Sequence, residues 1–134
     1  MQVGSIILLS LGMISCNSYS SDIDSVRIYY LPEDMLVPAD IEDPREFLYH
    51  PEVLRDTIVR NKKFLYDLQI QMESLTPLED STIPMDLRIH ILIRYETDSM
   101  KYLSMGQGFG TLLDSVRMKD NPCLYELIKN VIYK

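Results

Sequence analysis

The sequence has no tryptophan, and only two cysteines and two histidines among its 134 residues. Two cysteines cannot build a disulfide framework, and we expect Cys123 to be a free thiol because Cys16 ends an apolar leader segment. No Cys/His spacing fits a zinc site, and the acidic residues Asp40, Glu42, Asp43 and Glu46 lack the spacing of a calcium loop. We therefore expect neither a metal nor a cofactor.

Basic residues are also scarce. The 13 Lys and Arg face 20 Asp and Glu, which gives a net charge of −7. Because an acidic surface repels phosphate backbones and anionic bilayers, this balance disfavours nucleic acid as a partner and offers no electrostatic route to a membrane. The hydrophobic content of 46% is that of an ordinary globular chain, which argues against disorder.

A long apolar run is missing too. The apolar segment at residues 3–15 is uncharged but holds only 13 residues, whereas a membrane-spanning helix needs about 20. Its length fits the apolar core of a secretory signal peptide, and a polar run from Asn17 to Asp22 directly follows Cys16. We therefore predict a signal peptide over residues 1–15.

The residues at the end of this segment, Met13-Ile14-Ser15-Cys16, resemble the lipobox of bacterial lipoproteins, in which a small residue precedes the modified cysteine. The resemblance implies cleavage before Cys16, a diacylglyceryl group on its sulfur, and a further acyl chain such as palmitate on its new amino group. Two or three acyl chains anchor a protein stably where one is marginal. Residues 16–24 would then be the lipidated cysteine and a flexible tether.

The same resemblance implies a location in the bacterial cell envelope. In the sorting rule of enteric bacteria, an Asp after the lipidated cysteine retains the protein in the inner membrane. Asn17 stands at that position, which favours the outer membrane, on its periplasmic or surface face. The lipid would make the membrane a partner of an otherwise acidic chain.

Residues 25–134 have the pattern of one small α+β domain. Alternating, β-branched or aromatic residues predict four strands: 25–31, 86–96, 100–105 and 111–118. The last three follow one another closely, with a tight turn at 97–99. We therefore expect a meander and not βαβ units.

Polar caps and prolines mark the beginnings of helices. Asn121-Pro122 begins a final helix to about residue 133, and Asp43-Pro44 begins a short helix to residue 49, after an acidic loop over 32–43.

A further helix covers residues 62–75. Residues 51–61 leave two possibilities open: that helix extends backwards through them, or an extended piece at 57–59 precedes Asn61 as the cap. We favour the second, because Asn is a poor interior residue and a good cap. The predicted fold class is α+β, an antiparallel sheet of about four strands with two main helices packed on one face.

Candidate binding residues gather on one predicted face of the sheet: Arg27, Tyr29, Arg88, His90 and Arg94. Such a basic and aromatic patch could hold a carboxylate or an anionic sugar. The alternative, which we favour, is an ordinary solvated face whose arginines pair with local Asp and Glu. His90 has no partner in the sequence that would make it a general base, and Ser104 and Ser115 lack a nucleophile pattern, so we expect no catalytic residue.

Residues 106–110 are rich in glycine but lack both the Lys and the full G-x-G-x-x-G of a phosphate-binding loop. We interpret them as a flexible hairpin or bulge. An exposed Phe109 at its tip is a further candidate contact residue.

These features favour a lipid-anchored envelope protein that acts as a non-catalytic binding or accessory module for a protein or glycan partner. A more specific alternative is an immunity or inhibitor lipoprotein whose acidic domain covers a basic partner enzyme. Another is a small hydrolase that uses His90. A concave pocket that joins His90 to a carboxylate within hydrogen-bond reach would favour the enzyme, and a flat sheet face would favour binding.

Overall fold

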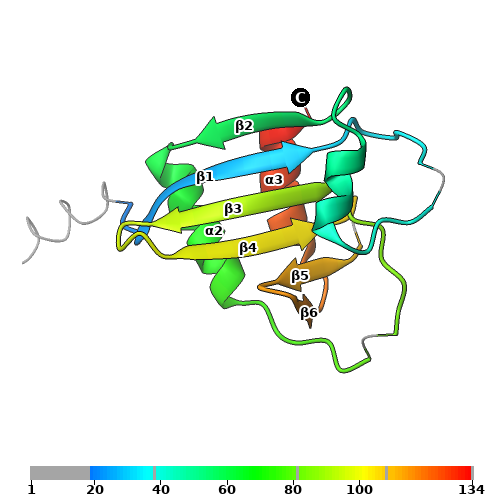
Figure 1. Cartoon of the computed structure of the whole chain (residues 1–134). Coiled ribbons are helices and arrows are strands. Elements are labelled where there is room, and N and C mark those ends of the chain that lie inside the picture. The colour runs from blue at the N-terminus through cyan, green and yellow to red at the C-terminus, as the bar shows by residue number, and fades with distance from the viewer. Residues whose placement is uncertain (1–18, 38, 81, 108, 134) are drawn as a thin grey trace, which may run out of the picture.

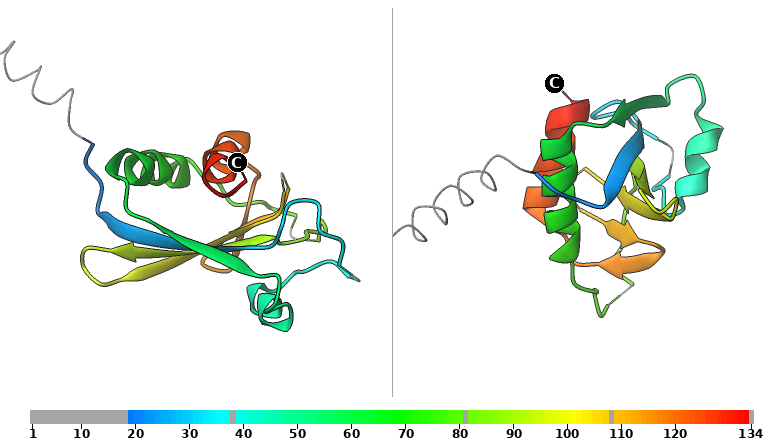
Figure 2. Two further views of the ribbon diagram at one scale, coloured as in Figure 1. Left: turned by 90° about the horizontal axis from the view of Figure 1, so that it is seen from above. Right: turned by 90° about the vertical axis from the view of Figure 1, so that its left-hand side faces the viewer.

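The computed structural model describes residues 19–37, 39–80, 82–107 and 109–133. The predicted signal peptide and Cys16 lie outside these residues. Two helices cover one face of an open antiparallel sheet, and the chain between the first two strands crosses the other face (Figures 1 and 2). The elements follow one another as β1 (Ile23–Tyr30), the 3-10 helix η1 (Pro44–Tyr49), β2 (Arg55–Val59), α2 (Lys62–Glu73), β3 (Ile89–Tyr95), β4 (Met100–Met105), β5 (Thr111–Leu113), β6 (Val116–Met118) and α3 (Pro122–Ile132).

The α+β class, the antiparallel sheet and the two main helices are confirmed, but the prediction of about four strands was wrong. The sheet has six strands in the order β2-β1-β3-β4-β5-β6. One additional strand is β2, which includes the extended piece favoured at residues 57–59 and pairs with β1. The other arises because the predicted strand at 111–118 is a hairpin: Asp114 and Ser115 take positive φ angles of 48° and 69° and turn the chain back between β5 and β6.

The connectivity is also richer than the expected meander. Strands β3 to β6 do form a meander of neighbouring antiparallel strands. Strands β2 and β3, however, both run antiparallel to β1, which lies between them, so β2 and β3 are parallel to each other. Parallel strands need a crossover connection, and α2 supplies it by passing over β1 on the way from β2 to β3. The early part of the sheet is therefore a split β-α-β unit.

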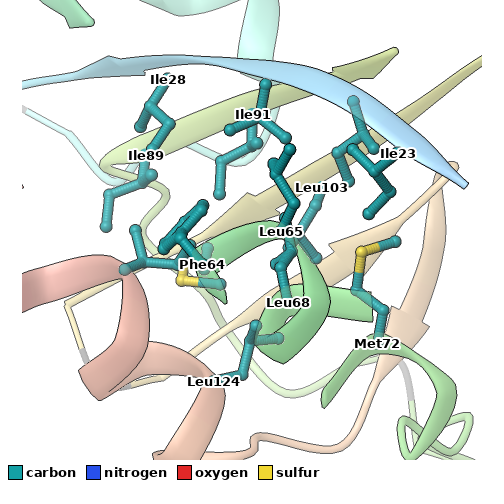
Figure 3. Close-up of a cluster of buried hydrophobic side chains, with 14 residues drawn as sticks. Ile23, Ile28, Phe64, Leu65, Leu68, Met72, Ile89, Ile91, Leu103 and Leu124 are labelled. Atoms are coloured by element: carbon teal, nitrogen blue, oxygen red, sulfur yellow. The ribbon is translucent and has the colours of Figure 1, made fainter. Parts of the chain in front are cut away.

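The main core lies between the sheet and the two helices (Figure 3). On β3, the alternate residues Ile89, Ile91 and Ile93 are fully buried on this face. Helix α2 contributes Leu65, Leu68 and Met72, which the three- and four-residue spacing of a helix brings to one side, and α3 contributes Leu124 and Ile128. Burying a side chain of this size stabilises a fold by roughly 1.5–3 kcal/mol.

Both predicted asparagine caps are confirmed. The side-chain oxygen of Asn61 accepts a hydrogen bond from the Phe64 backbone N–H, at 3.0 Å. Asn121 caps α3 in the same way through the N–H groups of Cys123 and Leu124. Its amide nitrogen also donates to two side chains at the end of α2, which ties the two helices together.

The connection between β1 and β2, residues 31–54, crosses the face of the sheet opposite the helices (Figure 2). We call this face the outer face. The connection forms a second small core in which Leu31, Ile41, Phe47 and Leu87 are buried. The predicted short helix at 43–49 is present as η1, which Asp43 caps by accepting from the Arg45 backbone N–H at 2.9 Å. The buried residues of the second core therefore pack this connection against the sheet.

A largely buried ion pair holds the 31–54 connection in place. Arg88 donates to Asp86 at 2.7 Å, and the two side chains are only 11% and 16% exposed. Asp86 also accepts from the Ile41 backbone N–H at 2.8 Å, and Arg88 donates to the Met35 carbonyl oxygen. Asp86 and Arg88 thus each form a hydrogen bond with a different backbone point of the connection. We call this pair the clamp.

We expect Asp86→Asn to destabilise the domain by about 3 kcal/mol, because removing one partner leaves the buried Arg88 charge unpaired. Asp24→Asn is the matched control, since it breaks the exposed pair between Arg94 and Asp24 and should change stability little. Urea unfolding of the two variants measures the difference. Equal losses in both variants would show that Asp86 and Arg88 do not form a buried clamp.

Candidate functional site

An open pocket of about 800 Å³ lies on the outer face, between the strands and the 31–54 connection. Its volume is within the range of small-molecule pockets, about 300–1,000 Å³. The sheet contributes Tyr29, His90, Leu92, Tyr102, Ser104 and Leu112 to the lining. The connection contributes Glu42, Asp43, Pro44, Arg45, Phe47 and Leu54, and Met85 and Ser115 complete it. Most of these side chains are aromatic or aliphatic.

The period of two along β3 places His90 and Leu92 on this face. Because Ile89, Ile91 and Ile93 point to the helices, the residues between them point to the opposite side. Tyr29 on β1 is opposite His90 in the register. The floor of the pocket thus follows directly from the strand pairing.

His90 is the central polar group of the pocket. Its Nδ1 atom lies 2.7 Å from the hydroxyl oxygen of Ser104, which stands opposite it on β4. The ring runs parallel to that of Tyr102, with centroids 6.1 Å apart, and the Phe47 ring lies 6.3 Å away. Burial lowers the pKa of His90, because desolvation penalises the charged imidazolium. A neutral imidazole has one donor and one acceptor nitrogen, and the tautomer sets which role Nδ1 plays toward Ser104.

The contact between His90 and Ser104 holds the imidazole ring in place but does not make Ser104 a suitable nucleophile. A catalytic serine must reach its substrate and needs a base that a third group orients. Ser104 is only 2% exposed. Among residues 19–133 as described, no hydrogen bond joins His90 to a carboxylate, so the pocket is concave but its histidine has a hydroxyl partner. The Ser104 hydroxyl group therefore positions the His90 ring.

The arginines of the predicted patch are each paired with an aspartate. The pairs are Arg27 with Asp56, Arg88 with Asp86 and Arg94 with Asp24, each at 2.7 Å. Arg27 also lies over the Tyr29 ring, 5.0 Å from its centroid. The structure therefore brings Tyr29 and His90 together in the pocket, while Arg88 belongs to the clamp and the other two arginines form exposed surface pairs.

Phe109 is placed elsewhere. It lies in the connection between β4 and β5, is 51% exposed and does not line the pocket. Gly106 begins that connection, where an added Cβ would lie 2.2 Å from the Phe109 carbonyl oxygen. This close approach of the backbone requires glycine at position 106.

Sequence reasoning missed the apolar lining, above all Leu92, Tyr102, Leu112 and Phe47. Two signals could have found it. Leu92 is an apolar residue on the strand face expected to be polar, which indicates that both faces of β3 are covered. The 24 residues between β1 and β2 are far more than a hairpin needs, and long ordered connections are commonly functional.

No family of known proteins, no curated protein and no solved structure matches the chain. A functional interpretation must therefore come from the site itself.

Two other features can be read within the described part of the chain. None of its helices is long and apolar enough to cross a membrane. The described residues also contain no group of three or more His, Cys, Asp or Glu side chains that could hold a metal ion.

We expect the pKa of the His90 ring to lie below its ordinary value of 6.5, which an NMR titration of the ring protons measures directly. With a lowered pKa in the folded state, the unfolded chain takes up the proton first as the pH falls. His90 then contributes stability that is complete above about pH 6.5 and is lost as the pH falls through the folded-state pKa. His90→Gln should remove this part of the pH dependence. A ring pKa at or above 6.5 would contradict the burial argument.

Proposed function

We propose that this protein is a lipid-anchored bacterial envelope protein that binds a protein or glycan partner without catalysing a reaction, and that the outer-face pocket is its binding site. The observation that carries the proposal is the pocket of about 800 Å³ beside a clamped wall. Pockets that bind ligands are concave, largely apolar and equipped with a few polar groups that fix orientation. His90 and the hydroxyl groups of Tyr29 and Tyr102 are such groups.

The clamp supports binding because it removes an ordering cost. A loop that becomes ordered only on binding loses conformational entropy at that step, and this loss lowers the affinity. Here Phe47 is 3% exposed and Ile41 2% exposed in the second core, so the wall of the pocket is already ordered.

The place where the described part of the chain enters the sheet is compatible with the proposed lipid anchor. Tyr19, the first described residue, packs on Tyr66 of α2 with ring centroids 5.6 Å apart. The chain enters β1 at the end of the sheet away from η1 (Figure 1). We propose that a lipid on Cys16 tethers the domain from the side of the first residues of β1, which lie away from η1 and its pocket-lining Phe47, and that the membrane is the outer membrane.

We expect the binding partner to crosslink from the pocket and not from the helices. Tyr102→p-benzoylphenylalanine places a photoreactive group at a pocket side chain that is 46% exposed, and Ile70→p-benzoylphenylalanine is the matched control, 43% exposed on α2. Irradiation of cells that express each full-length variant should give a discrete adduct from position 102 only. Adducts from position 70 alone, or equally from both, would remove the pocket from the proposal.

The anchor has its own test. We expect Cys16→Ala to abolish incorporation of labelled palmitate and to move the protein from the membrane to the soluble fraction, because the acyl chains on Cys16 are the proposed anchor. Cys123→Ala is the control, since Cys123 is an exposed free thiol on α3 and should leave labelling unchanged. If the Cys16→Ala protein stays in the membrane fraction, the lipoprotein proposal is wrong.

A further inference from the structure

The chain's negative charge is concentrated in the 31–54 connection, part of which lines the pocket. The 31–54 connection holds seven of the 20 acidic residues and one of the 13 basic residues, so it carries −6 of the chain's net −7. The remaining 110 residues are almost balanced, at −1. If the acidic residues served only to keep the surface charged, they would be distributed over the whole molecule. Instead they are concentrated in a connection that lines the pocket, which makes the surroundings of the site negatively charged.

Few of these carboxylates are neutralised within the protein. Asp43 pairs with Arg45, and Glu33 lies 3.8 Å from the ammonium group of Lys129. In the described ranges, the other five form no ion pair: Asp34, Asp40, Glu42, Glu46 and Glu52. Glu42 lines the pocket itself, and Glu46 lies on η1. An apolar, aromatic interior is thus bordered by unpaired negative charge.

We infer that the occupant of the pocket is a basic segment of a partner protein, which inserts one aromatic or large aliphatic side chain and sets flanking Lys or Arg side chains against Glu42 and Glu46. This inference rests on the proposed function and chooses between its two kinds of partner. A neutral glycan would gain nothing from the carboxylates of Glu42 and Glu46, and an anionic glycan would be repelled by a connection whose net charge is −6.

The two parts of the site have different tasks in such a complex. Burial of one large side chain in a preformed pocket supplies most of the affinity, as buried aromatic anchors do in protein interfaces. The carboxylates attract a basic surface from a distance and discriminate against acidic ones, mainly through the association rate. Binding should therefore weaken as salt screens the exposed charges.

The test uses the full-length chain in detergent and three capped pentapeptides as probes: Arg-Lys-Trp-Lys-Arg, Arg-Lys-Ser-Lys-Arg and Glu-Asp-Trp-Asp-Glu. Isothermal titration calorimetry at about 50 mM and about 300 mM NaCl gives the Kd of each. We expect the basic peptide with Trp to bind at least about tenfold more tightly than either other peptide. Its affinity should fall about tenfold at the higher salt concentration.

Matched variants separate the charge from the pocket. Glu42→Gln with Glu46→Gln should weaken the basic Trp peptide about tenfold. Glu73→Gln with Glu126→Gln makes the same change in net charge on exposed positions of α2 and α3 and should have no effect. Tyr102→Ala should weaken the peptide by removing part of the pocket lining, and a circular-dichroism melt checks that each variant folds.

The outcomes distinguish the two proposals. If the acidic and basic Trp peptides bind equally, or if both glutamate double variants behave alike, the basic-partner inference is overturned while the pocket remains the proposed site. Absence of binding by the basic Trp peptide, or tighter binding of neutral maltohexaose, also overturns it. If the basic Trp peptide binds but Tyr102→Ala does not lower its affinity, the pocket is not the binding site. The part of the proposed function that places binding in the pocket is then wrong.

Discussion

Asp86 and Arg88 stand immediately before β3 and hold the 31–54 connection against the outer face. Burying two charges is costly, and their attraction repays the cost only when further hydrogen bonds satisfy the remaining atoms. Here the Ile41 N–H and the Met35 carbonyl do so from two points of the connection. Such a pair adds little net stability compared with an apolar pair of equal size. We interpret its role as geometric, because it gives the wall of the pocket one position.

The same strand, β3, organises both faces of the domain. Its isoleucines fill the core under α2 and α3, while His90 and Leu92 form the floor of the pocket. A shift of one residue in its pairing would send the isoleucines to the pocket and the histidine into the core. The register with β1 and β4 is therefore a condition for the site as well as for stability.

Local patterns allowed much of this fold to be predicted. The alternation in β3 and the caps Asn61 and Asn121 act over a few residues, so the sequence displays them directly. The hairpin between β5 and β6 was missed because Asp114-Ser115 lacks the glycine that usually marks such a turn. The crossover through α2 was missed because strand order depends on tertiary packing.

The candidate site was predicted only in part, for a related reason. Tyr29 and His90 could be placed on one face from their period of two, and the pairing of arginines with aspartates was the favoured interpretation. The particular partners could not be named: Arg94 and Asp24 are 70 residues apart in the chain, and no local rule joins them. The pocket also needs a connection to fold back over the sheet, which only the complete domain specifies.

The place of β1 in the sheet has a consequence for the order in which the domain folds. β1 is made first yet lies between β2 and β3, and β3 is separated from it by the whole 31–54 connection and α2. The hairpins from β3 to β6 close through short turns and can form early, whereas insertion of β1 requires a long loop to close. Until then the isoleucine face of β3 lacks a neighbour on one side. Pairing of β1 thus covers both a bare strand edge and an apolar surface, two features that promote aggregation while they are exposed.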